Sequence, residues 1–274
     1  MLRKLIKHEL RATSRIMLPL FLLVLVTAAG GNLATKELLE TDIAFLNVLG
    51  IILLTAFLVA IAAVCIVAFF LMVQRFYKNL LQDEGYVMMT LPVSVHQHIW
   101  SKVLVSNIWF AATFLVVLAA VLILAFDIEY VAQFFREFSL FWETAMEYLS
   151  QEGIGHLLLF VLELLLLVFT GAVLSCLQFY APMAIGQSFA KSKLLMSVVV
   201  YFAINFIMQL ISGIIASIAE KSGVANAFGE YIINATGLAA VHPILLLSIV
   251  SSAILAGIFY ALTAYNLKNR LNLE

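Results

Sequence analysis

One carboxylate lies inside a long apolar stretch of this sequence. Glu163 interrupts the otherwise uncharged residues 154–183, and His156 precedes it by seven residues, which places both side chains on one helix face. A carboxylate deep in an apolar membrane segment costs roughly 2.5–3.5 kcal/mol on insertion scales, so it must face a bundle interior or a wet cavity, or be protonated. Glu163 with His156 therefore has two interpretations: a substrate or proton path, or a structural hydrogen bond between helices.

Other familiar reaction and binding motifs are missing from the sequence. It holds no Gly-x-x-x-x-Gly-Lys-[Ser/Thr] loop that would hold ATP phosphates, and no His-Glu-x-x-His zinc motif. His96 and His98 are two residues apart, which puts them on different faces of a helix. Cys65 and Cys176 lie in apolar runs, where we expect small buried side chains. We therefore expect no enzymatic activity, no metal and no cofactor in this chain.

The composition indicates that lipid is the main solvent of the chain. Of its 274 residues, 64% are hydrophobic and only 11% are Asp, Glu, Lys or Arg. Soluble domains carry roughly 45–50% apolar and about 25% charged residues. The net charge of −1 gives no electrostatic footprint for nucleic acid, so we expect no nucleic-acid partner.

Six apolar stretches are each long enough to cross a bilayer as a helix, which needs roughly 20 residues. They are residues 16–31, 43–73, 103–126, 154–183, 194–219 and 243–265. The runs are continuous rather than alternating in polarity, which favours helices over barrel strands. Asn205 and Gln209, four residues apart in the fifth stretch, are expected to hydrogen-bond neighbouring helices.

The positions of the basic residues predict the orientation, because cytoplasmic loops retain Lys and Arg. With a cytoplasmic N-terminus, 12 of the 15 basic residues are cytoplasmic and three are outside. The cytoplasmic set is Arg3, Lys4, Lys7, Arg11, Arg15, Arg75, Lys78, Lys102, Lys191, Lys193, Lys268 and Arg270, and the outside set is Lys36, Arg136 and Lys221. Both termini are therefore predicted to be cytoplasmic.

Residues 1–15 have the pattern of an amphipathic helix that enters the membrane surface. Apolar side chains share one side, and the opposite side carries the basic residues Arg3, Lys4, Lys7, Arg11 and Arg15. Such a helix lies in the interface with its basic side towards anionic headgroups. Glu9 falls on the apolar side, so it either pairs with another cytoplasmic segment or is one imperfect position. A cleavable signal peptide is the alternative, and the regular pattern speaks against it.

Residues 74–102 form the one long cytoplasmic loop, and it is not a flexible linker. Gly85 can end the helix that continues from the second stretch. Pro92 disfavours helix immediately before it, and Ser94 has capping-box spacing to Gln97, so a new helix should begin at Ser94. The apolar residues between these breaks are either an interface or pack back on their own helices.

Several segments resemble the small bacterial permeases of the ABC-2 type. They are residues 5–11 (LIKHELR), 75–80 (RFYKNL), 83–86 (DEGY), 90–94 (TLPVS) and 266–273 (NLKNRLNL). The resemblance implies a permease subunit of the bacterial plasma membrane, more often an exporter than an importer. It implies two permease chains, identical or paralogous, with two soluble ABC ATPase subunits that bind the ATP.

The same resemblance implies which residues contact the ATPase. A short coupling helix in the first cytoplasmic loop would dock in a groove of that subunit. By position, the docking residues are Asp83, Glu84, Gly85, Tyr86, Thr90, Leu91 and Pro92. Many members of the family carry an outer domain or a re-entrant pair before the last span, whereas this chain has only residues 220–242 there. The substrate is therefore not implied.

The outside residues 127–153 are also amphipathic. Aromatic side chains alternate there with acids in helical spacing, namely Phe134, Phe135, Phe138, Phe141 and Trp142. This pattern predicts a helix that rests on the outer interface, with a substrate lid as the alternative.

The sequence thus predicts an all-α membrane protein with one transmembrane domain over residues 1–274. The domain has six spanning helices, an interfacial entry helix at residues 1–15, a coupling loop at 74–102 and an amphipathic outer segment at 127–153. The function that fits is an ABC transporter permease. Its rivals are a proton-coupled secondary carrier that uses Glu163, and a membrane sensor or assembly subunit that transports nothing.

Overall fold

A computed structural model describes residues 2–39, 41, 43–82, 85, 90, 92–125, 128–152, 154–189, 192–235 and 237–269. Helices account for every element assigned in these ranges. The elements are α1 (Leu2–Leu33), η1 (Ala34–Leu38), α2 (Ala44–Leu81), α4 (Val95–Leu124), α5 (Ile128–Glu152), α6 (Ile154–Gly186), α7 (Lys193–Lys221), α8 (Val224–Asn234), η2 (Gly237–Ala240) and α9 (His242–Asn269).

Within the described residues, each of the six apolar stretches falls almost wholly in one long helix, as the sequence predicted. In the described part of the chain six helical segments are long and apolar enough to cross a membrane: α1 with η1, α2, α4, α6, α7 and α9. The 38 residues of α2 would extend about 57 Å at 1.5 Å per residue, well beyond a hydrocarbon core of about 30 Å. The chain is therefore an all-helical, multi-pass membrane protein.

The amphipathic residues at the start are not a separate element. Helix α1 runs without interruption from Leu2 to Leu33, and Pro19 lies inside it. No glycine precedes residue 30. Pro19 removes one backbone hydrogen bond, and the helix continues on either side of it. The expected entry helix and the first spanning stretch are thus one helix in this structure.

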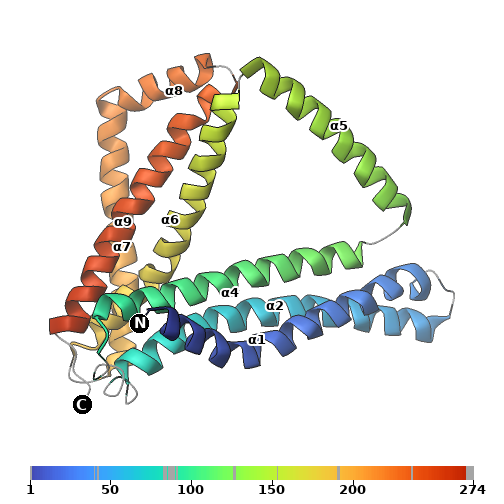
Figure 1. Cartoon of the computed structure of the whole chain (residues 1–274), viewed down its shortest axis with the longest axis horizontal. Coiled ribbons are helices and arrows are strands. Elements are labelled where there is room, and N and C mark those ends of the chain that lie inside the picture. Colours follow the sequence, from blue (N-terminus) through green and yellow to red (C-terminus); the bar gives the residue numbers. More distant parts are fainter. Residues whose placement is uncertain are drawn as a thin grey trace. The chain divides into compact units, whose positions relative to one another are not determined.

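The chain divides into two compact units, of which the first comprises residues 1–76 and 96–140. Its centre is formed by α1, α2 and α4, which lie side by side in Figure 1. Met17 and Val24 of α1 pack with Val64 of α2 and Ala120 of α4, and all four side chains are fully buried. Small residues such as Ala60 and Ala68 on α2 let these helices approach closely, as is usual between membrane helices.

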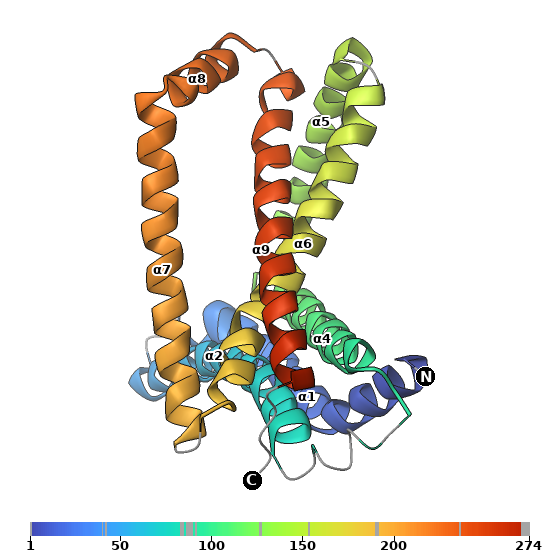
Figure 2. The ribbon, with the colours of Figure 1, turned by 90° about the vertical axis from the view of Figure 1, so that its left-hand side faces the viewer.

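The second unit comprises residues 77–95 and 141–274. Its helix α6 packs against both α7 and α9, and Figure 2 shows α8 connecting the end of α7 towards α9. Ser252 of α9 donates a hydrogen bond to Thr170 of α6 at 2.8 Å. At the corner between α7 and α8, Gly223 has φ of 76°, a conformation in which a side chain would be strained.

The local stop and start signals were partly correct. Helix α4 begins at Val95, immediately after Ser94, which confirms the start expected there. Helix α2 ends at Leu81, before the expected stop at Gly85, and the Gly85 N–H instead closes a turn onto the Gln82 carbonyl at 2.7 Å. The segment expected to lie outside forms the helix α5, as its spacing predicted.

Candidate functional site

Glu163 is buried and bonded to a different helix. Its side chain is 5% exposed, and its Oε2 lies 2.7 Å from Nδ1 of His242, the first residue of α9. The imidazole of His242 is 12% exposed. The pair therefore ties α6 to α9, which is the interhelical hydrogen bond that the sequence left open as one of two roles.

His156 is not the direct partner of Glu163, which corrects the sequence-based pairing. The His156 ring lies against the His242 ring instead, with ring centres 5.7 Å apart and planes inclined by 30°. His156 is exposed, whereas Glu163 is buried, so the three side chains lead from the surface of the second unit inward. The sequence did not predict the contact with His242, because this residue lies 79 positions from Glu163. Its place beside Pro243, at the start of the last apolar stretch, was the one signal available.

The arrangement has one open hydrogen-bonding position. Nε2 of His242 is buried and has no hydrogen-bond partner among the described residues. When Nδ1 carries the proton and donates to Glu163, Nε2 is a free acceptor that can take a proton. Within the described ranges no group of three His, Cys, Asp or Glu side chains is placed to hold a metal ion. The chemistry that these groups allow is proton binding or structural pairing.

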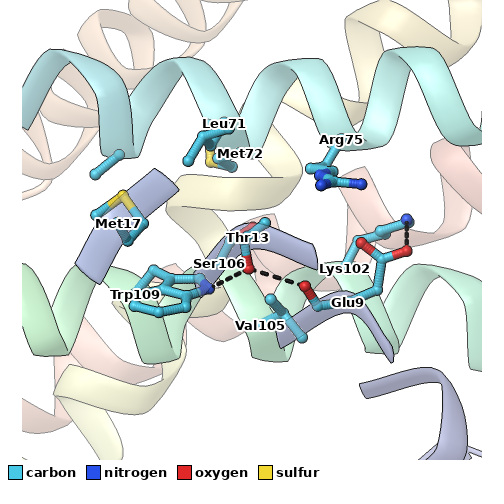
Figure 3. A pocket seen from close by; sticks show the side chains of 11 residues that line it. Glu9, Thr13, Met17, Leu71, Met72, Arg75, Lys102, Val105, Ser106 and Trp109 are labelled. Atoms are coloured by element: carbon cyan, nitrogen blue, oxygen red, sulfur yellow. Dashed lines mark hydrogen bonds and ion pairs between the residues drawn. The ribbon is translucent and has the colours of Figure 1, made fainter. Parts of the chain in front are cut away.

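A second polar cluster lies in the first unit, among α1, α2 and α4. Lys102 Nζ is 2.5 Å from Glu9 Oε1, and the two side chains are 2% and 5% exposed. This contact answers the question that Glu9 raised, since it pairs with a residue that the sequence placed at the end of the cytoplasmic loop. Thr13 donates to the Glu9 carbonyl at 2.8 Å and accepts from Trp109 Nε1 at 2.6 Å, as Figure 3 shows.

The basic residues of α1 occupy the side of the helix opposite this cluster. Glu9, Thr13 and Met17 are its buried positions in this part of the helix. The exposed positions include all the residues expected at the membrane surface: Arg3, Lys4, Lys7, Arg11 and Arg15. The two-sided distribution therefore agrees with the sequence pattern, and contact with lipid remains a proposal.

The structure describes only part of the expected docking segment. Asp83, Glu84, Tyr86 and Leu91 lie outside the described residues. Of the others, Thr90 and Pro92 are exposed, and Gly85 is buried. Docking to an ATPase thus remains a proposal.

One of the two amides predicted to link helices does so. Asn205 Oδ1 of α7 accepts a hydrogen bond of 2.8 Å from Gln178 Nε2 of α6, which confirms that prediction. Gln209, one turn further along α7, has an exposed side chain beside Gly213 and Ser217.

The interpretation of these sites depends on their own geometry. No family model, no curated protein and no solved structure matches the chain.

Proposed function

We propose that the chain is the membrane-spanning permease subunit of an ATP-driven transporter whose ATPase is a separate soluble protein. The observation that carries the proposal is the segment between α2 and α4. It holds the residues that resemble the ABC-2 docking element, and a long continuous helix stands on each side of it. The absence of a phosphate-binding loop in the sequence fits this division of labour.

The two flanking helices suit a mechanical connection. Helix α2 continues past Val73, the end of the second apolar stretch, to Leu81, and α4 begins at Val95, eight residues before the third apolar stretch. Each extension is about two helical turns, which is stiff on this length scale. Movement of an ATPase bound to the segment would therefore reach the spanning helices directly. The proposed contact residues are Asp83, Glu84, Gly85, Tyr86, Thr90, Leu91 and Pro92.

The remaining parts of the proposal concern orientation and assembly. The excess of Lys and Arg on one side supports cytoplasmic termini and a cytoplasmic docking segment. The basic side of α1 would then rest on anionic headgroups of the inner leaflet. Family likeness favours export, a bacterial plasma membrane and a second permease chain, identical or paralogous.

Accessibility labelling tests the sidedness on which the docking role depends. In a Cys65→Ala/Cys176→Ala background, Tyr86→Cys should react with a membrane-impermeant maleimide in inside-out vesicles but not in intact cells. Ser139→Cys on the exposed side of α5 is the matched control, and it should react in intact cells. Labelling of position 86 from outside would eliminate the docking role.

Coupling is tested by substitution in the same segment. Tyr86→Ala and Leu91→Ala should each remove a contact of about 2 kcal/mol with the ATPase. The MgATP hydrolysis measured for the ATPase that co-purifies with the chain should therefore fall about 30-fold. Gln82→Ala, which removes an exposed neighbour, should leave it unchanged. Wild-type hydrolysis and transport in both docking variants would contradict the proposal, and a chain that never co-purifies with an ATPase would favour a subunit that does not transport.

The buried Glu163–His242 pair favours a second candidate, a proton-coupled carrier. A carboxylate and an imidazole share a hydrogen bond within apolar helices, and His156 extends the group to the surface. Transport by such a carrier would persist without ATP, collapse with a protonophore and disappear in Glu163→Gln. In the permease, Glu163→Gln should leave ATP-driven transport within about twofold of wild type, since the amide can still bond His242.

A further inference from the structure

A small pocket among α1, α2 and α4 of the first unit holds more positive than negative charge. It is lined by Glu9, Lys102 and Arg75, and by apolar side chains such as Met17 and Leu71. Figure 3 shows the Arg75 side chain directed to the same space as the Glu9–Lys102 pair. With two cations and one carboxylate, the group carries a formal charge of +1.

The positive charge of Arg75 is not balanced by a carboxylate of this pocket. Lys102 and Glu9 pair with each other and are almost completely buried. No carboxylate in the described part of the chain forms an ion pair with Arg75, whose side chain is half-buried. A guanidinium at the edge of an apolar pocket carries five N–H donors in a fixed fork, and this geometry matches a phosphate or a carboxylate.

The position along the helices places this charge at headgroup depth. Arg75 follows the uncharged residues 43–73 by two positions, and Lys102 directly precedes the uncharged residues 103–126. Both residues thus stand where the hydrocarbon core gives way to the interface. An anionic group bound there could remain attached to acyl chains that stay in the bilayer.

The dimensions of the pocket agree with a ligand that projects no more than one oxygen atom into it. The enclosed space is about 20 Å³, room for one water-sized group. Arg75 and Trp109 are the pocket residues that reach the exposed surface, and the other lining side chains are buried. A bulky soluble anion would have to leave most of its volume outside, whereas a lipid is already there.

We propose that Arg75 and the adjoining pocket bind the phosphodiester group of an acidic phospholipid. The guanidinium fork holds two phosphate oxygens, and the acyl chains stay in the bilayer beside the half-buried Arg75 and Trp109. The exposed basic residues of α1 concentrate acidic lipid at the same membrane surface. This site does not depend on the transport function proposed above, because it needs only the three helices and the bilayer.

The test uses the full chain, purified in a neutral detergent, with thermal unfolding as the readout. Phosphatidylglycerol is titrated at about 1 M NaCl, where the screening length of about 3 Å suppresses contributions from distant surface charges. A lipid that binds the folded chain raises its unfolding temperature in proportion to occupancy. Phosphatidylcholine and inorganic phosphate, titrated over the same range, form the two comparison arms.

Arg75→Gln should raise the half-saturating concentration of phosphatidylglycerol about tenfold or more, because charge-assisted hydrogen bonds to the phosphate are lost. Arg75→Lys, which keeps the charge without the fork, should show an intermediate loss. Arg11→Gln, which removes one exposed charge of α1, is the matched control and should change it less than about twofold.

Three results would overturn the proposal. The first is wild-type affinity in both Arg75→Gln and Arg75→Lys, when each variant shows a normal unfolding transition without lipid and is therefore folded. Phosphatidylcholine could stabilise the wild-type chain as well as phosphatidylglycerol does. Inorganic phosphate could match the lipid, which would assign the pocket to a free anion instead.

Discussion

Removing one partner of the Glu9–Lys102 pair should destabilise the first unit more than any surface change. At 2.5 Å and an effective dielectric constant of about 20, the Coulomb attraction is about 6–7 kcal/mol. Desolvation of the two ions offsets much of this attraction. The observable quantity is the loss when one ion is left alone, which is about 3–5 kcal/mol for buried pairs.

The third charge in the pocket makes the two single substitutions unequal. Glu9→Gln removes the carboxylate that pairs with Lys102, which is 2% exposed, and leaves two cations at the pocket, so it should lose about 3–5 kcal/mol of unfolding free energy. Lys102→Met leaves Glu9 with Arg75 as a replacement cation, so the loss should be smaller, about 1–3 kcal/mol. The double substitution should lose much less than the sum, because no buried lone charge remains.

Unfolding by sodium dodecyl sulfate in mixed micelles, followed by tryptophan fluorescence, measures these differences. The control is Glu37→Gln, which removes an exposed carboxylate of η1 and should change stability by less than about 0.5 kcal/mol. Additive single losses, or a Glu9→Gln loss no larger than that of the control, would refute the reasoning. A larger loss in Lys102→Met than in Glu9→Gln would refute the role given to Arg75.

Two further predictions concern the second unit. Gly186→Ala should lower the unfolding free energy by about 1–3 kcal/mol, because the added Cβ would lie 2.7 Å from a backbone nitrogen of α7. Its control is Gly213→Ala, which has open space around it and should change the unfolding free energy by less than about 1 kcal/mol. Asn205→Leu should lose about 0.6 kcal/mol, up to about 1.7, by removing the bond from Gln178, and Gln209→Leu should lose nothing measurable in the same assay. Equal effects within either pair would contradict the packing described.

The helices themselves could be read from the sequence because their causes are local. A continuous apolar run of about 20 residues must satisfy its backbone groups internally, and only a helix does so within one segment. In the described part of the chain, each run accordingly falls almost wholly in one long helix. Ser94 marked the start of α4 for an equally local reason, because Ser is among the residues favoured immediately before a helix.

The same local reasoning misjudged the ends of α1 and α2. The amphipathic residues before Pro19 and the first spanning stretch have different patterns, yet one helix contains both, and Pro19 does not interrupt it. Gly85 permits a helix to end but does not require it, and α2 had already ended at Leu81. A pattern that allows a boundary does not determine where the boundary falls.

The partners of the buried charges were decided by tertiary structure alone. The sequence showed that Glu9 and Glu163 lie among apolar residues, where a lone buried charge is costly, and it left open whether each has a partner. It did not show that Glu9 meets Lys102, 93 residues away, or that Glu163 meets His242, 79 residues away. Helical period determines which residues share a face, but which faces meet depends on how whole helices pack, and packing is a property of the entire chain.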